Sequence, residues 1–410
     1  MRRWMIRGTL VLFSFAVSIA IAELLVRKLA PQDAFIFGMS IYEPDDAADY
    51  RLAAHLRMKQ GATQGGTTFT TNALGFRNRE IAIAKPAGLT RILCLGDSMT
   101  FGLQILREDG PYPQQLEKLL NQGEPTPRYE VLNAGVSGYG TDQEVATLRT
   151  RLLGLAPDIV TIGFFPSNDV TDNLYQGEKE VYQGLVITAR ADRTHSFETR
   201  VRATLHRWLM PLHLYRYLLL RWKSASEQHT KGAAPAPAAP PAPAEDRGGL
   251  SASRRDELSL PAPGSSGWKL GTEDVLSRTL AVFHKTPTPL LEELGWPNTL
   301  RYFREARDLA REHGFRLYVV LLPDRLAVDD ANREKLLAQL GEDGADLDFE
   351  LPLRRAKAFL DQERIGTIEV LAALRATGLG AQLFIFDDRH LNARGCQIVA
   401  SEMARVLRAH

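Results

Sequence analysis

Hydrophobic residues recur along the chain in two alternating patterns, short apolar runs and amphipathic stretches with helical spacing. The apolar runs predict buried strands at residues 91–95, 129–132, 158–165 and 316–322. Helical spacing predicts helices at 112–120 and 141–153, a helix capped by Asn298 and ended by Gly314, and a last helix at about 393–407, which the apolar run 383–386 precedes. Strands that alternate with helices indicate an α/β fold with a parallel sheet.

The amino terminus has the pattern of a membrane segment. Residues 8–26 contain a single charge, Glu23, and follow the basic start Arg2, Arg3 and Arg7. These 19 residues would form about 28 Å of helix, close to the ~30 Å hydrocarbon core of a bilayer. We expect residues 1–28 to be a single-pass anchor in the inner (cytoplasmic) membrane, with the body on the exported, periplasmic side. A signal peptide cleaved near residues 20–22 and a buried core helix are the alternatives.

An Ala/Pro-rich run at residues 233–244 interrupts the body. Proline breaks helices and the flanks hold few large apolar residues, so we expect residues 223–266 to be a disordered insertion. We therefore predict a single domain in two parts, residues 90–200 and 267–410. The remaining additions are a leading extension at 29–89 and an amphipathic helix at 201–222. The segment Leu205–Trp222 fits either a membrane surface or a cap beside the active site.

Composition excludes several classes of protein. A formal net charge of +1 over 410 residues argues against a nucleic-acid partner. The two cysteines, Cys94 and Cys396, exclude a disulfide scaffold and a thiolate-rich zinc module, and we expect two buried thiols rather than a disulfide. Neither a nucleotide-binding glycine loop nor a zinc-binding histidine pair occurs in the sequence, so we expect no cofactor and no metal.

Polar residues able to do chemistry directly follow the predicted strands, where the carboxyl ends of a parallel sheet present ligands. Ser98 follows the first strand and needs a base. His390 is the best base, and Asp387, three residues earlier, can orient its imidazole. Asn392 is the expected N-cap of the last helix.

Other interpretations of these residues stay open. Ser98 fits a turn or cap serine, and His390 fits a surface histidine at a helix start. Asp388 is a second candidate for orienting His390. The pattern Asp-x-x-His also occurs at residues 192–195, in a polar stretch with no strand before it.

Acyl transfer also needs donors for a developing oxyanion. Gly135 follows the second strand and can bring its N–H close, Asn168 follows the third and can offer its side-chain amide, and the Ser98 N–H is the natural third donor. Asp97 and Asp169 are expected to brace loops.

This set resembles the SGNH (GDSL) hydrolase family. The matching pieces are Gly96-Asp97-Ser98, Gly135, Asn168-Asp169 and Asp387-x-x-His390, in the family's order, over roughly residues 90–408 without the insertion. Pro166 stands where the family usually has glycine. The resemblance implies a flavodoxin-like three-layer α/β/α domain, with Ser98 as nucleophile, His390 as base, Asp387 as its orienting residue, and Ser98, Gly135 and Asn168 at the oxyanion hole.

The expected function is therefore that of an exported, membrane-anchored serine esterase. Location and family analogy favour an O-acetylated envelope or exported polysaccharide as the substrate. An O-acetyltransferase with the same triad, a lipid esterase and a non-catalytic polysaccharide-binding or assembly protein are the alternatives.

Overall fold

The computed structural model describes most of the predicted domain. The described residues are 2–30, 41–59, 68–105, 107–174, 179–182, 185–188, 201, 204–205, 208–209, 212–218, 280–340, 344–385 and 389–408. The predicted disordered insertion, the second Asp-x-x-His pattern at 192–195, Asp387 and Asp388 all lie outside them.

A five-stranded parallel sheet forms the centre of the molecule. Its strands follow the spatial order β11-β10-β7-β5-β6. Their bounds are β5 (Thr90–Gly96), β6 (Tyr129–Gly135), β7 (Ile159–Phe164), β10 (Arg316–Leu321) and β11 (Gly366–Glu369). Four of them confirm the strands predicted from apolar runs, and the fifth, β11, lies at one edge and was not predicted.

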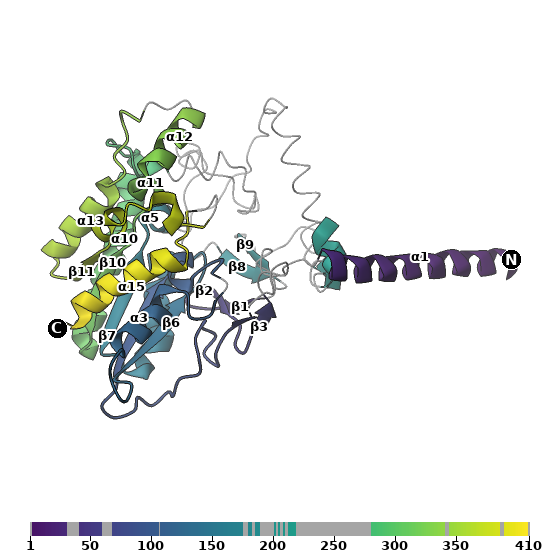
Figure 1. The fold of residues 1–410 in the computed structure, drawn as a ribbon, viewed down its shortest axis with the longest axis horizontal. Helices are drawn as coiled ribbons and strands as arrows, with labels where there is room; N and C mark the ends of the chain where they lie inside the picture. Colours follow the sequence, from purple (N-terminus) through teal and green to yellow (C-terminus); the bar gives the residue numbers. More distant parts are fainter. Residues whose placement is uncertain are drawn as a thin grey trace, which may run out of the picture.

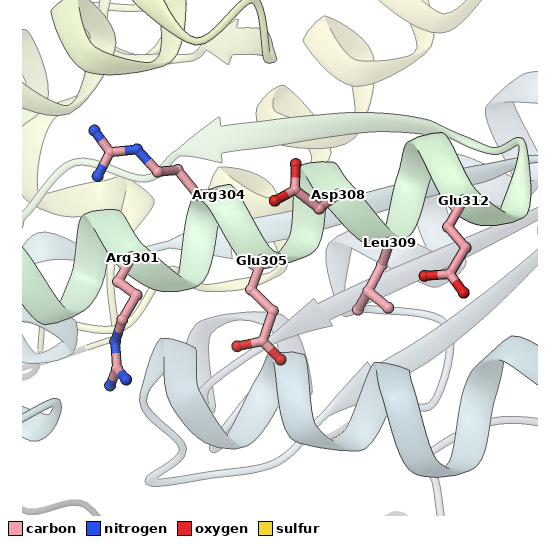
Figure 2. A pocket seen from close by; sticks show the side chains of 6 residues that line it. All are labelled: Arg301, Arg304, Glu305, Asp308, Leu309 and Glu312. Carbon is pink, nitrogen blue, oxygen red and sulfur yellow. The ribbon is translucent and has the colours of Figure 1, made fainter.

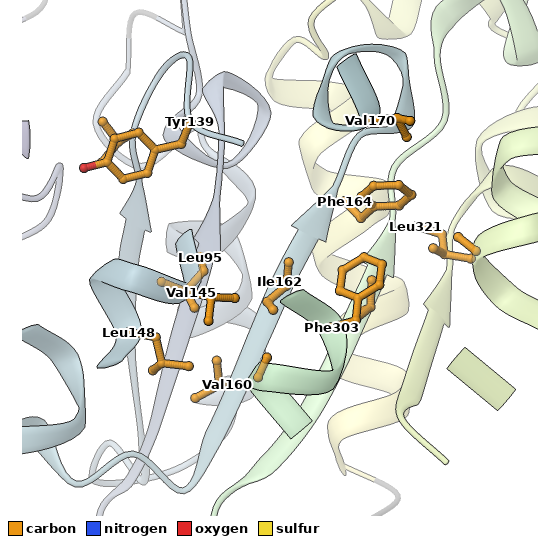
Figure 3. Packing of buried hydrophobic residues seen from close by; sticks show 14 of the residues in the cluster. Leu95, Tyr139, Val145, Leu148, Val160, Ile162, Phe164, Val170, Phe303 and Leu321 are labelled. Atoms are coloured by element: carbon orange, nitrogen blue, oxygen red, sulfur yellow. The ribbon is translucent and has the colours of Figure 1, made fainter. Parts of the chain in front are cut away.

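Helices cover both faces of the sheet, which gives the three layers that the resemblance implied (Figure 1). Side chains alternate along β5, with Ile92 and Cys94 facing one core and Leu93 and Leu95 facing the other. The first core is closed by α3 (Tyr112–Leu120), α14 (Leu371–Ala376) and α15 (Ala393–Arg408), and the second by α4 (Thr141–Thr147), α10 (Trp296–His313) and α13 (Leu351–Gln362). Figure 3 shows the second core, where Phe164 packs edge-on against Phe303.

Short elements connect these layers at the carboxyl ends of the strands and along the helices. They are the α-helices α2 (Ser98–Phe101), α5 (Pro166–Asp172), α11 (Arg325–Val328) and α12 (Asp330–Leu340), the π-helical turns η2 (Leu148–Leu152) and η4 (Leu291–Gly295), and the 3₁₀ turns η3 (Leu153–Leu155) and η5 (Gly380–Leu383). The predicted helix 141–153 is therefore α4 continued by η2 and η3.

The structure corrects one predicted helix start. Asn298 is not an N-cap, because α10 begins at Trp296 and continues directly from η4. The Asn298 amide instead donates to the Asn173 carbonyl at 3.3 Å. Gly314 ends α10 in the left-handed conformation as predicted, with φ of 73°. Residues 383–386 begin with the end of η5, and Phe384 then forms an isolated bridge with Leu391.

Three two-stranded antiparallel sheets accompany the domain. Their strands are β1 (Tyr42–Asp45) with β2 (Asp49–Leu52), β3 (Arg57–Lys59) with β4 (Thr68–Thr70), and β8 (Lys179–Tyr182) with β9 (Leu185–Thr188). The first pair belongs to the leading extension, and the Tyr50 hydroxyl donates to the Ser137 carbonyl at 3.1 Å. The extension is thereby attached to the loop that follows β6.

Helix α1 (Arg2–Leu29) projects away from the body (Figure 1). The segment Ile6–Leu29 is long enough to cross a membrane, and its most apolar stretch has a mean hydropathy of 2.3. Length and composition alone do not separate an anchor from a signal sequence.

Candidate active site

Ser98 lies at the sharp turn between β5 and α2. Asp97 is the N-cap of α2, and its Oδ1 accepts the Met99 N–H at 2.8 Å. This hydrogen bond fixes the first turn of the helix. Ser98 is therefore held as the first helical residue, half-buried, at the carboxyl end of the sheet.

Three glycines allow this turn to pack closely on the sheet. Gly96, Gly135 and Gly163 are neighbours in register on the three strands β5, β6 and β7. A Cβ at any of them would clash with Thr100 of α2. The Thr100 hydroxyl also forms a 2.7 Å hydrogen bond with the Tyr112 hydroxyl. These glycines thus set the height of Ser98 above the sheet.

Arg77 of the leading extension supports the same turn from its other end. The side chain is buried, and its guanidinium donates to the carbonyls of Gly102 and Ile105, each at 2.7 Å. Burial lowers the pKa of Arg77 to about 10. The leading extension therefore helps to hold the turn that carries Ser98.

His390 meets Ser98 from the opposite end of the chain. Its Nε2 lies 2.7 Å from the Ser98 Oγ, across 292 residues of sequence. Two backbone hydrogen bonds close the loop that carries it, from the Ile385 N–H to the His390 carbonyl and from the Asn392 N–H to the Leu383 carbonyl, both at 2.9 Å. Asn392 also caps α15 as predicted, since its Oδ1 accepts the N–H groups of Arg394 and Gly395.

The orienting role of Asp387 stays a prediction, because this residue lies outside the described part of the chain. A different acid, Asp324, is linked to the histidine loop. Asp324 Oδ2 accepts from Arg389 at 3.2 Å and from the Ser167 hydroxyl at 2.8 Å. Arg389 precedes His390 and Ser167 precedes Asn168, so this buried carboxylate links the chain beside the predicted base to the chain beside the predicted oxyanion donor.

Two of the predicted oxyanion donors, Gly135 and Asn168, donate their hydrogen bonds to other side chains. The Asn168 amide donates to Asp97 Oδ2 at 3.1 Å and to Asp172 Oδ2 at 3.3 Å. The Gly135 N–H donates to Asn133 Oδ1 at 3.1 Å, and its glycine identity is explained by the contact with α2. The roles of Asn168, Gly135 and the Ser98 N–H toward an oxyanion stay predictions, and the first two require these hydrogen bonds to open.

Three buried acids form an interacting group that includes Asp97, the residue before Ser98. Asp97, Glu144 and Asp169 are each at most 1% exposed. Asp169 Oδ2 accepts the Phe165 N–H at 2.7 Å, which confirms its loop-bracing role. Within the described residues, neither Glu144 carboxyl oxygen nor the Asp169 Oδ1 has a hydrogen-bond partner. Burial raises the pKa of all three carboxyls, and mutual repulsion raises those of Glu144 and Asp169 further.

Sequence reasoning missed Glu144, Thr100 and Arg77. Each is a polar residue in an amphipathic or loop segment, where exposure is the ordinary expectation. Cys94 and Cys396 are free and buried as expected, and burial raises the pKa of each thiol to about 12.

A surface hollow of about 400 Å³ lies elsewhere, along α10 (Figure 2). Its lining is charged, and the charges pair with neighbouring residues, as Glu305 does with Arg149 and Arg304 does with Glu363. Neither Ser98 nor His390 contributes to it. We therefore assign no catalytic role to this hollow. Among the described residues, no group of three or more His, Cys, Asp or Glu side chains is arranged to hold a metal ion.

Comparison with solved structures found esterases at low identity. An acetyl xylan esterase, AlAXEase, is 13% identical, with a TM-score of 0.37, over 77% of this chain and 99% of its own. A catalytic variant of the acetylxylan esterase Axe2 from Geobacillus stearothermophilus is 12% identical, with a TM-score of 0.38, over 77% and 93%. A GDSL-like lipase from Bacteroides thetaiotaomicron is 10% identical, with a TM-score of 0.33, over 78% and 88%. No curated protein matched the chain.

Family models match both parts of the domain. Residues 94–257 match the GDSL-like lipase/acylhydrolase family, and residues 283–410 match the SGNH hydrolase-like domain of the acetyltransferase AlgX. The first match contains Ser98, Gly135 and Asn168, and the second contains His390. Because the two matches together cover more than half of the sequence and meet in one site, the chain belongs to the SGNH (GDSL) hydrolase family.

Proposed function

We propose that this protein is a membrane-anchored serine esterase that removes O-acetyl or similar acyl groups from an exported or envelope polysaccharide. The observation that carries the proposal is the 2.7 Å separation between His390 Nε2 and Ser98 Oγ. A nucleophile and a base within hydrogen-bond reach are the first requirement for covalent acyl transfer.

The shorter distance supports His390 as the base. The Ser98 hydroxyl has a second neighbour, Asp97 Oδ2, at 3.4 Å. A strong hydroxyl hydrogen bond spans about 2.7–2.8 Å, so the contact with His390 is the effective one. Asp97 already accepts from Met99 and Asn168, which suits a bracing role.

The reaction then has two halves. His390 Nε2 takes the Ser98 proton as Oγ attacks the ester carbonyl, and the proton passes to the leaving sugar oxygen as the acyl group stays on Oγ. In the second half His390 activates water, which attacks the acyl-enzyme and releases the acid. Asn168, Gly135 and the Ser98 N–H are the donors we propose for the oxyanion in both halves.

Replacement of the nucleophile tests this proposal directly. Ser98→Ala should abolish turnover of a short-chain acyl ester and labelling by a fluorophosphonate probe, with unchanged thermal stability. Ser401→Ala, which removes an exposed hydroxyl on α15, is the matched control. Full turnover in Ser98→Ala would refute the mechanism, and an unlabelled wild-type protein would favour the non-catalytic binding role.

A transferase is the second candidate, because residues 283–410 match an acetyltransferase domain model. The same acyl-enzyme would then be attacked by a sugar hydroxyl in place of water. Mass spectrometry of an acetyl donor incubated with an unacetylated polysaccharide separates the two outcomes. Acetyl gained by the sugar indicates transfer, and free acetate indicates hydrolysis.

Helix α1 supports a proposed location. We propose that this helix is retained as a single-pass anchor in the inner membrane and holds the catalytic domain on the exported side. Intact mass of the purified protein tests retention, since cleavage near residue 22 would remove the span. A preference for long-chain lipid esters over acetylated polysaccharide would instead support the lipid esterase.

A further inference from the structure

Glu23 is the one charged residue within the apolar stretch 8–26 of α1, and it is not left to solvent or lipid. Its side chain is 12% exposed. Oε1 accepts the backbone N–H of His213 at 3.1 Å, and Oε2 accepts that of Leu214 at 2.7 Å. Arg27, one turn further along α1, pairs with the same carboxylate at 3.0 Å.

These contacts join two segments that are 190 residues apart in the sequence. Residues 213–218 form a short helix, and the first N–H groups of a helix have no partner within it. A carboxylate at that position supplies acceptors and complements the helix dipole. An isolated carboxylate within a membrane helix is costly, so the same contact stabilises both segments.

The position of Glu23 fixes the depth of the second segment. Glu23 precedes the end of α1 at Leu29 by six residues, which is about 9 Å of helix. Residues that contact Glu23 therefore lie at the level of the candidate span rather than beyond its end. In Figure 1 the short helical pieces of this region lie beside the end of α1 nearest the body.

The same segment exposes large apolar side chains. Leu205 is 50% exposed, Trp208 76% and Leu218 55%. Tryptophan and leucine beside basic residues are typical of helices that lie in the boundary between lipid headgroups and acyl chains. The sequence places Arg202, Arg207 and Arg221 in the same region.

We propose that the described residues 204–205, 208–209 and 212–218 belong to a second membrane element, attached to α1 by Glu23, whose partner is the outer lipid surface. This inference rests on the proposed retention of α1 as an anchor. Two attachments, α1 and this segment, would hold the catalytic domain at a defined height above the bilayer, where α1 alone would leave it free to rotate.

Depth-dependent quenching of a fluorophore tests the proposal. Trp208→Cys is labelled with an environment-sensitive fluorophore in the full-length protein, reconstituted in vesicles of phosphatidylcholine and phosphatidylglycerol. Cys94 and Cys396 are buried and do not compete for label. Ile83→Cys, at an apolar residue of the body that is 56% exposed, is the matched control.

We expect acyl-chain quenchers to reduce the signal at position 208 several-fold and to leave position 83 unchanged, with the reverse pattern for aqueous iodide. Quenching of position 208 by iodide alone would overturn the proposal. Protection from both quenchers would also overturn it, since it would indicate that protein, such as the active-site entrance, covers the segment.

Variants of Glu23 test the attachment. Glu23→Ala removes both acceptors and should lower acyl-chain quenching at position 208 and raise iodide quenching. Arg27→Gln keeps both acceptors and should change neither. Unchanged quenching in Glu23→Ala would refute the role of Glu23.

Ester turnover measured on the same samples keeps this proposal separate from the proposed function. An active enzyme with a water-exposed position 208 contradicts only the membrane element. An inert enzyme with lipid quenching contradicts only the esterase.

Discussion

Arg91 and Asp97 are fully buried at the two ends of β5, and the charged groups at these ends differ in how completely they are hydrogen-bonded. At the amino end, the Arg91 guanidinium donates to Glu130 Oε2 at 2.7 Å and to the carbonyls of Leu155, Ile83 and Ala82 at 2.7–3.1 Å. All three nitrogens of the guanidinium donate at least one hydrogen bond. This charge is compensated within the protein.

At the carboxyl end, Asp97 belongs to a group of three buried acids. Its carboxylate accepts from Met99 and Asn168, but Glu144 and one oxygen of Asp169 have no partner among the described residues. Such an arrangement costs stability, because buried polar atoms without partners lose their hydration.

This difference indicates that the residues at the amino end of β5 stabilise the fold and that those at the carboxyl end contribute to the site. Loss of either partner of a buried ion pair leaves an unpaired charge and strongly destabilises the fold, so Arg91 and Glu130 serve stability. Strained electrostatics beside a nucleophile is typical of functional sites, which are often less stable than they could be. Substitutions at the amino end should therefore change stability, and those at the carboxyl end should change activity.

The largest expected effect is at Asp387. If this residue orients His390, Asp387→Asn should lower kcat by about 10⁴-fold, because an amide favours the wrong imidazole tautomer. Steady-state kinetics on a short-chain ester, with thermal unfolding as a check on folding, measure it. Asp388→Asn is the matched control, and a larger loss in that variant would assign the orienting role to Asp388.

Removal of the buried Arg91 cation at the amino end of β5 should have the next largest effect. Arg91→Met leaves Glu130 buried and unpaired, which we expect to lower the free energy of unfolding by about 3–5 kcal/mol. Urea unfolding in detergent measures the loss, with turnover per folded molecule unchanged. Arg405→Met, which breaks an exposed pair with Glu402, should cost less than about 1 kcal/mol. Equal losses in the two variants would contradict the comparison.

Substitution of Asn168 tests whether the carboxyl end of β5, where the three buried acids lie, also supplies an oxyanion donor. Asn168→Ala should lower kcat by about 10²–10³-fold, the loss expected for one donor, with little change in KM. Asn298→Ala removes a nearby amide that donates to a backbone carbonyl and is the control. An unchanged kcat would show that Asn168 acts only to hold Asp97.

Much of the fold could be predicted because four of the five strands, β5, β6, β7 and β10, contain apolar runs bounded by turns. Strand β11 could not, since Gly366–Glu369 carries one large apolar residue, Ile368, and its edge position leaves the others partly exposed. The predicted start of α10 was wrong because asparagine is a preferred N-cap residue, which made Asn298 the expected cap. Trp296 and Pro297 already continue the helix from a preceding π turn.

The contact between Ser98 and His390 was predictable because each residue lies in a short motif beside a recognisable element. The rest of the site depends on long-range packing that no local pattern records. Glu144 lies in the first turn of α4, where an acidic residue ordinarily stabilises an exposed helix end. Only the assembled sheet brings it to the buried side of Asp97, and only the three-dimensional contact joins Glu23 to His213.

The smallest expected effect is a change in how stability depends on pH. The ordinary pKa of glutamate is 4.5, and burial raises that of folded Glu144 well above this value. Above about pH 4.5 the unfolded chain releases this proton while the folded protein keeps it. The unfolded state then binds fewer protons, so the free energy of unfolding falls as pH rises, by at most about 1.4 kcal/mol per pH unit.

Glu144→Gln removes this titration, because the amide stays neutral. Urea unfolding from about pH 5 to pH 8 should therefore give a shallower decline for Glu144→Gln than for the wild type. Glu293→Gln, at a residue outside the acidic group, is the control and should keep the wild-type slope. Parallel curves for Glu144→Gln and the wild type would mean that the buried acids at the carboxyl end of β5 are compensated as fully as Arg91, and the contrast between the two ends would then be lost.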